Sequence, residues 1–209
     1  MTTTLLLHGF CTDLETPLRQ VKPADAGFQV FCSHVESGEY CVFRWGEKRR
    51  LSVFDAVNPF SYLSLYRVER QKARDVELLH SLQETLQKTK PTQIICHSMG
   101  CYLLIQYLQR FQLPESVKKI TFLQADCSLG DLESLSAKKT LMHVEFQHIY
   151  SFFDYTLWTS SLLHRTIRAG LRPVQFLSAK NTFFPSFSSI NLHTACLIDK
   201  RMLEVVNQM

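Results

Sequence analysis

The fold of this chain is decided by residues 91–112, which read PTQIICHSMGCYLLIQYLQRFQ. The opening of this stretch, Thr92–Ile95, is apolar and β-branched and predicts a buried strand. From Tyr102–Leu108 apolar side chains are spread around a helix, which ends at Leu113-Pro114. A strand and a helix therefore meet at Ser98.

The residues on either side of Ser98 are small. Gly100 lies two positions after the serine and Cys96 two positions before it. A serine on a sharp strand-to-helix turn projects its hydroxyl above a sheet, and the flanking backbone is so crowded that only small side chains fit. Cysteine is small enough for such a turn, although glycine is usual at that position. The pattern predicts a nucleophile elbow.

Four segments spread along the chain resemble those of the α/β-hydrolases. They are Leu5-Leu6-Leu7-His8-Gly9-Phe10, Cys96-His97-Ser98-Met99-Gly100, Asp154 and His193, in the order oxyanion loop, serine, acid and histidine. The resemblance is to a compact, lipase- or esterase-like branch of serine hydrolases. It implies a three-layer α/β fold, with a mostly parallel central sheet and helices on both faces. Residues 1–209 are expected to form a single domain without a large lid or cap.

The resemblance also implies roles for particular residues. A serine hydroxyl needs a base, and the base needs a carboxylate to fix its tautomer. His193 lies in a polar loop before the closing helix, where the family places its histidine. Asp154 follows the strand that usually delivers the acid, and Asp126, at the end of the preceding strand, is the alternative. Either aspartate could instead serve only as a helix N-cap.

Two further groups of residues complete the expected site. The resemblance places the oxyanion-binding N–H groups at Phe10 and at Met99, directly after the nucleophile. Aromatic side chains could line an acyl pocket, although core packing explains them equally well. The candidates are Phe60, Tyr62, Phe183 and Phe184.

Composition limits the other possibilities. The chain has 209 residues and a net charge of +4, with its basic residues in short groups, so no nucleic-acid partner is expected. Its 7 cysteines show no CxxC spacing and no secretory leader precedes them, which favours free thiols in the cytoplasm. No apolar run approaches the length of a membrane span. The histidines and cysteines show no metal-ligand spacing and no glycine-rich phosphate loop is present, so neither a metal nor a cofactor is expected.

The periodicity predicts the remaining elements. Strands are expected at Thr3–Leu7, Tyr40–Trp45, Lys119–Leu123, Leu141–Tyr150 and Arg172–Leu177, with a short extended piece at Gly27–Ser33. Helices are expected at Ser61–Lys88, Thr156–Ala169 and Leu197–Val206, besides the one that follows Ser98.

These observations lead to a functional expectation. The chain is expected to be a serine hydrolase that cleaves carboxylic esters or thioesters of a small-molecule acyl substrate through an acyl-enzyme. The same apparatus could transfer the acyl group or hydrolyse an amide, because the fold does not decide this. The alternative is a binding or scaffold protein that keeps the fold without catalysis. The acyl chain length and the oligomeric state are open at this level.

Overall fold

A six-stranded parallel sheet forms the centre of the molecule. The computed structural model describes residues 3–10, 28–46, 59–176, 179–188 and 192–207. Neighbouring strands follow the order β2-β1-β3-β4-β5-β6, and every pair is parallel. The strands are β1 (Thr4–Leu7), β2 (Tyr40–Phe43), β3 (Gln93–His97), β4 (Lys119–Leu123), β5 (Glu145–Tyr150) and β6 (Lys180–Phe183).

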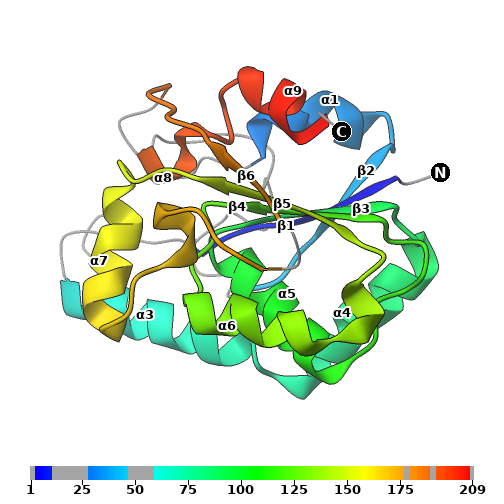
Figure 1. The fold of residues 1–209 in the computed structure, drawn as a ribbon, viewed down its shortest axis with the longest axis horizontal. Coiled ribbons are helices and arrows are strands. Elements are labelled where there is room, and N and C mark those ends of the chain that lie inside the picture. Colours follow the sequence, from blue (N-terminus) through cyan, green and yellow to red (C-terminus); the bar gives the residue numbers. More distant parts are fainter. Residues whose placement is uncertain (1–2, 11–27, 47–58, 177–178, 189–191, 208–209) are drawn as a thin grey trace.

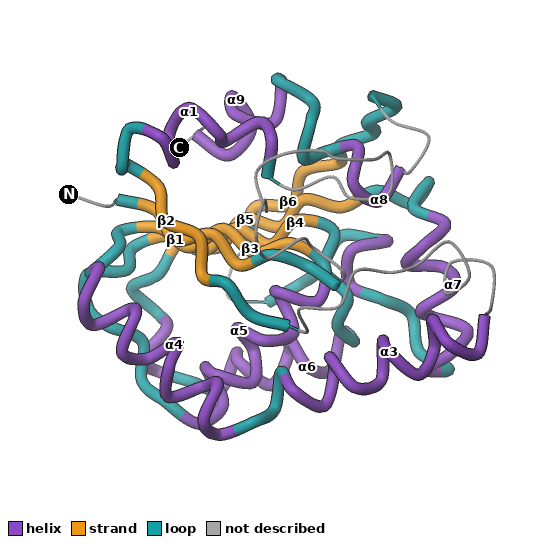
Figure 2. The backbone as a smooth tube through the Cα atoms, turned by 180° about the vertical axis from the view of Figure 1, so that it is seen from behind, coloured by secondary structure: helices purple, strands orange, loops and turns teal. Residues whose placement is uncertain are grey.

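Helices cover both faces of this sheet (Figures 1 and 2). On one face lie α1 (Cys32–Glu36) and α9 (Arg201–Asn207), and on the other α3 (Pro59–Lys72), α4 (Val76–Thr89), α5 (Met99–Arg110) and α6 (Leu129–Glu133). Two more, α7 (Tyr155–His164) and α8 (Leu192–Ala195), lie at one end of the sheet. Short 3-10 turns occupy Gln29–Phe31, Ser134–Ala137, Lys139–Leu141 and Ala169–Leu171. The three-layer α/β architecture expected from the sequence is confirmed.

Strand alternation divides the core into two clusters. In β1, Leu5 and Leu7 join the larger cluster against α4 and α5, while Leu6 faces the opposite way and joins the smaller one under α1 and α9. In β3, Ile95 likewise faces the smaller cluster. Successive side chains of a strand point to opposite faces, so a sheet covered on both sides has apolar residues throughout its strands. This explains the continuous apolar runs in the sequence.

Several element predictions were wrong. Residues 28–33 do not extend but form a 3-10 turn and the start of α1. The helix expected at Thr156–Ala169 ends at His164, because Arg165 takes a left-handed conformation that closes α7. The last strand is Lys180–Phe183 and not Arg172–Leu177, of which Leu177 lies outside the described residues. The helix expected at Ser61–Lys88 is two helices, α3 and α4.

Within the described ranges, no helix combines the length and the apolar character that crossing a membrane requires.

Candidate active site

Ser98 occupies the turn between β3 and α5. Its backbone has φ 52° and ψ −120°, a strained conformation for a residue with a side chain. The turn is held on both sides: the Ser98 N–H donates to the Leu123 carbonyl at 3.0 Å, and the Ser98 carbonyl accepts from the N–H of Asp126 at 3.1 Å. Strain fixed by surrounding bonds in this way is typical of functional positions.

The crowding expected around this serine is present. A Cβ built on Gly100 would lie 2.4 Å from the Leu7 carbonyl oxygen and 2.5 Å from that of His8, so the helix can begin here only with glycine. On the other side the fully buried Cys96 fits, and its Sγ lies 3.4 Å from the Thr121 carbonyl oxygen. Cysteine is therefore compatible with this turn in place of the usual glycine.

His193 meets Ser98 above this turn. The distance from His193 Nε2 to Ser98 Oγ is 2.7 Å, and the distance from His193 Nδ1 to Asp154 Oδ2 is 2.6 Å. The histidine lies on the short helix α8 and not in an open loop. The structure thus brings together the serine, the histidine and one of the two candidate acids.

Asp154 has two partners of different kinds. Its Oδ1 accepts the backbone N–H of Leu157 at 3.0 Å and caps the start of α7. Its Oδ2 faces His193 and also accepts from Gln124 Nε2 at 3.0 Å. The residue is completely buried. The N-cap and the histidine partner are therefore not alternatives, because each uses a different carboxylate oxygen.

The electrostatics of His193 depend on this carboxylate. Burial opposes protonation of the imidazole, but the charge of Asp154 and its hydrogen bond outweigh burial and raise the pKa of His193 above its ordinary 6.5. A base whose pKa is raised by a buried carboxylate accepts a proton more readily. The arrangement can therefore withdraw a proton from Ser98 and hold the resulting imidazolium.

Asp126 belongs to a different network. Its carboxylate accepts hydrogen bonds from Tyr66 Oη and Ser160 Oγ, both at 2.7 Å, and lies 3.1 Å from Arg168 Nε. Arg168 is 1% exposed, so the ion pair is buried. In the structure, His193 is therefore hydrogen-bonded to Asp154, whereas Asp126 neutralises a buried arginine.

The loop after β1 packs directly against the serine. A Cβ on Gly9 would lie 2.8 Å from Ser98 Cβ, so Phe10 follows a residue in contact with the turn. The preceding His8 anchors this loop: its Nε2 accepts the N–H of Trp45 at 3.1 Å, and its ring stacks on that indole. Met99 opens α5 immediately after Ser98, where helical N–H groups have no partner in the helix. Gly9, the residue before Phe10, and Met99 therefore both lie next to the serine.

Sequence reasoning missed the roles of two residues beside the site. His97 Nε2 donates to the His193 carbonyl at 3.0 Å, so this ring supports the backbone of the histidine opposite Ser98. Gln124, at φ 42°, donates both to Asp154 and, at 3.3 Å, to the Leu192 carbonyl. The available signal was position: each polar side chain ends a buried strand, or directly follows one, at the edge of the sheet that carries the serine.

The candidate pocket residues are placed differently from one another. Phe184 is buried in the smaller core cluster with Leu6 and Ile149. Phe183 is 37% exposed and stacks on Phe152 with ring centroids 4.5 Å apart. Phe60 and Tyr62 lie on α3, but their side chains fall outside the described part of the chain.

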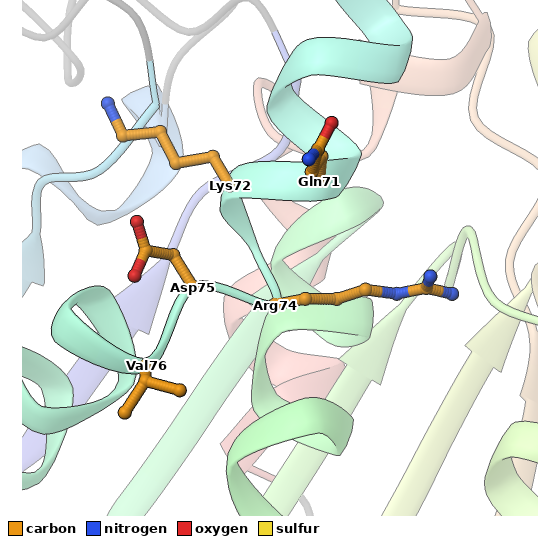
Figure 3. A pocket seen from close by; sticks show the side chains of 5 residues that line it. All are labelled: Gln71, Lys72, Arg74, Asp75 and Val76. Carbon is orange, nitrogen blue, oxygen red and sulfur yellow. The ribbon is translucent and has the colours of Figure 1, made fainter.

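A surface pocket lies elsewhere, at the junction of α3 and α4 (Figure 3). Its lining residues have structural partners: Lys72 Nζ donates to the Gly46 carbonyl at 2.6 Å, and Asp75 caps α4. Neither Ser98 nor His193 contributes to it. Among the residues that the structure describes, no three His, Cys, Asp or Glu side chains gather in a way that could hold a metal ion.

The sheet order, the strand–Ser98–helix turn and the position of His193 after the last strand define the chain as having the α/β-hydrolase fold. No family model matches the sequence, and no curated protein matches it.

Solved structures of similar shape share little sequence with this chain. A novel bacterial esterase is 12% identical with a TM-score of 0.46, covering 99% of this chain and 78% of its own. MenH from S. aureus is 10% identical with a TM-score of 0.47, covering 98% and 91%. An extracellular α/β-hydrolase from a Paenibacillus species, described as homologous in structure and function to tobacco salicylic acid binding protein 2, is 13% identical with a TM-score of 0.36, covering 88% and 78%.

Proposed function

We propose that this protein is a serine hydrolase that cleaves carboxylic esters or thioesters through an acyl-enzyme. The observation that carries the proposal is the continuous chain of hydrogen bonds from Ser98 Oγ through His193 to Asp154. A nucleophile, a base and a buried orienting carboxylate within hydrogen-bond reach of one another are the requirement for serine catalysis. Asp126 is instead engaged by Tyr66, Ser160 and Arg168, and the proposal gives it no catalytic role.

The reaction has two halves. Ser98 Oγ attacks the substrate carbonyl while its proton passes to His193 Nε2, and a tetrahedral oxyanion forms. The oxyanion collapses, the bond to the leaving oxygen or sulfur breaks, and His193 returns the proton to the departing alcohol or thiol. A water molecule, deprotonated by His193, then attacks the acyl-serine. The bond between the acyl carbon and Ser98 Oγ breaks, His193 returns the proton to Ser98 Oγ, and the carboxylic acid is released.

The oxyanion would be held by backbone donors. We assign this role to the N–H groups of Phe10 and Met99, because Gly9 packs on Ser98 and Met99 begins α5. Donors fixed before the charge develops stabilise the transition state without reorganisation, and each is worth about 3–4 kcal/mol. His97 and Gln124 act as positioning residues for His193 and Asp154.

The proposal includes a place of action. The six cysteines within the described residues are all free thiols, which supports a reducing compartment such as the cytoplasm. The reaction needs no cofactor, since the nucleophile, the base and the oxyanion donors all come from the chain.

The direct test is labelling with a fluorophosphonate probe, which reacts with activated serines. Wild type should be labelled, whereas Ser98→Ala and His193→Ala should not. Ser81→Ala and His80→Ala, both at exposed positions of α4, are matched controls and should be labelled like wild type. A folded wild type that stays unlabelled would remove the catalytic proposal in favour of the scaffold alternative.

A further inference from the structure

Exposed apolar side chains are concentrated beside the candidate site. Among the described residues twelve large hydrophobic side chains are exposed, and nine of them lie between Phe152 and Phe187. The other three, Val68, Val76 and Met142, lie elsewhere on the chain. Single exposed apolar residues are normal, but a contiguous group is typical of an interaction surface.

The first part of this group is a cluster of phenylalanines. Phe152 and Phe153 have ring centroids 4.6 Å apart, and both contact Phe183, Phe152 by parallel stacking. Phe187 extends the cluster at 5.8 Å from Phe153. The four side chains are between 37% and 66% exposed, so their rings contact one another and solvent.

The second part is a stripe along α7. Tyr155, Trp158 and Leu162 are spaced i, i+3 and i+7 and therefore lie on one side of the helix, with exposed fractions of 51%, 48% and 81%. Trp158 Nε1 donates to the Phe152 carbonyl at 2.9 Å and ties the stripe to the phenylalanine cluster. We call these seven residues together the α7 face.

The exposed charges of the segment that carries the α7 face have one sign. Between Ser151 and Ser188 the only carboxylate is Asp154, which is fully buried. Two arginines of the same segment, Arg165 and Arg172, are exposed, whereas Lys180 begins β6 at the edge of the sheet away from Ser98. An apolar surface whose own segment exposes arginines and no carboxylate is complementary to a negatively charged, partly apolar partner.

The α7 face also adjoins the candidate site. Phe153 directly precedes Asp154, which opens α7, and α7 contacts α8, which carries His193. Both views of the fold place α7 and α8 at the same end of the sheet (Figures 1 and 2). A partner bound on this face would be held beside Ser98.

We propose that the α7 face docks on the surface of an anionic lipid assembly. Tryptophan and tyrosine favour the boundary between lipid and water, because their large rings carry a polar group. Phenylalanine and leucine join tryptophan on the apolar side of helices that lie in this boundary. The exposed arginines would be attracted to anionic headgroups. The fit to this occupant comes from the two features together, since apolar area alone would suit many partners.

Docking on a lipid surface is a property separate from the proposed reaction. What docking implies about the substrate, however, rests on that reaction. If Ser98 is the nucleophile, the acyl groups within its reach are those of esters at a lipid surface. Binding itself does not need catalysis, so the Ser98→Ala variant is expected to bind as wild type does.

The test is flotation with vesicles of phosphatidylcholine, alone or mixed with phosphatidylglycerol. The protein should float with the mixed vesicles and its binding should weaken as salt is added. The double variant Leu162→Ser/Phe187→Ser should lose at least about tenfold in vesicle partitioning, since each removed side chain takes apolar area out of the lipid contact. Met142→Ser, an equally exposed apolar change away from the α7 face, is the matched control and should bind normally. Far-UV circular dichroism and thermal melting establish that each variant is folded.

Tryptophan fluorescence gives an independent readout. The chain has 2 tryptophans, and Trp45 is buried, so a blue shift on adding vesicles reports on Trp158. Absence of flotation and of a blue shift with mixed vesicles would overturn the inference, as would a double variant that binds like wild type. A protein that binds vesicles but is never labelled by fluorophosphonate would keep the docking surface and lose the proposed reaction. Fluorophosphonate labelling without vesicle binding would keep the proposed reaction and overturn the docking surface.

Discussion

At Gly100 the backbone around the Ser98 turn leaves no space for a side chain. A methyl group there would collide with two backbone carbonyls of the β1 end, at 2.4 and 2.5 Å, and neither can move without shifting the central strand. We expect Gly100→Ala to lower the free energy of unfolding by about 2–4 kcal/mol or to prevent folding. Urea denaturation measures this. Gly130→Ala is the control, because a Cβ at that position meets only Ser128 Oγ, at 3.9 Å, and it should be neutral within about 1 kcal/mol. Equal effects of the two changes would contradict the crowding argument.

The two candidate acids can be separated by matched substitutions. Asp154→Asn should lower kcat by about 10³–10⁴-fold with little effect on folding, since an amide cannot hold the correct tautomer of His193. Asp126→Asn should instead act on stability, because it leaves Arg168 buried without its counter-charge, at a cost of about 3–5 kcal/mol. Measured kcat and urea midpoints of both variants decide the assignment. A stable Asp126→Asn variant with kcat reduced as far as in Asp154→Asn would reverse it.

The raised pKa of His193 predicts the pH dependence of the reaction. Only the neutral imidazole can accept the serine proton, so kcat/KM should rise with pH and level off above a pKa higher than 6.5. Removing the carboxylate takes away the interaction that raises this pKa. The residual activity of Asp154→Asn should therefore show its acid limb at lower pH than wild type. A limb that does not move would show that another group controls the profile.

At this scale the sequence indicated the residues that the structure brings together at Ser98 better than the residues that support them. Ser98 and His193 each stand at a fixed place in a recognisable order, whereas the acid was left open between Asp154 and Asp126. His97 and Gln124 were not, because their roles depend on the path of a backbone far away in sequence: the residues they contact, His193 and Leu192, lie 96 and 68 positions further along.

At the scale of elements, the break between α3 and α4 shows that the spacing of apolar residues does not indicate where one helix ends and the next begins. The pattern continues from one helix to the next, but Asp75 takes an extended conformation and its side chain accepts the N–H of Glu77 at 2.9 Å. The aspartate therefore starts a new helix within a run that looks continuous.

The cap of α4 gives a test at this scale. Asp75→Ala should cost about 1 kcal/mol, whereas Asp75→Asn, which keeps a side-chain oxygen, should cost much less. Thermal or urea unfolding compares the two. A loss in Asp75→Asn as large as in Asp75→Ala would show that the carboxylate charge matters more than the cap.

The wrongly predicted last strand has a related cause. Val174 and Phe176 are buried in the larger core cluster, so these two side chains alternate as in a half-buried strand without being part of the sheet. The Val174 N–H and carbonyl are satisfied by the side chain of Asn181, both at 2.8 Å, in place of a neighbouring strand. A buried segment outside the sheet and a buried strand show the same apolar pattern in sequence, and only the tertiary structure distinguishes them.

At the scale of the whole molecule, buried histidines make stability depend on pH. Burial lowers the pKa of His8 and of His148 to about 4 and places that of His97 well below its ordinary value. In the unfolded chain these groups take up protons near pH 6.5. Unfolding is therefore favoured progressively as pH falls from about 6.5 towards 4, by about 1–3 kcal/mol for each of His8 and His148.

Urea denaturation at a series of pH values tests this directly. The free energy of unfolding should be highest above about pH 7 and should decline steadily on acidification. His148→Gln, which cannot ionise but can still donate to the carbonyls of Ala169 or Arg172, should show a shallower decline than wild type. Parallel curves for the two proteins would exclude His148 as a source of the pH dependence.

The sheet order also bears on how the chain reaches this structure. β1 lies between β2 and β3, and its pairing with β3 joins Thr4 to Gln93 and Leu7 to Cys96. Contacts between residues so distant in sequence form only after a large loop has closed, and closing this loop costs conformational entropy. Such contacts therefore slow folding. During synthesis the first strand can complete its pairing only after the segment that carries Ser98 has left the ribosome. The apolar strand β1 therefore lacks its β3 neighbour until that segment has been made, which makes a nascent chain of this order a natural client of chaperones.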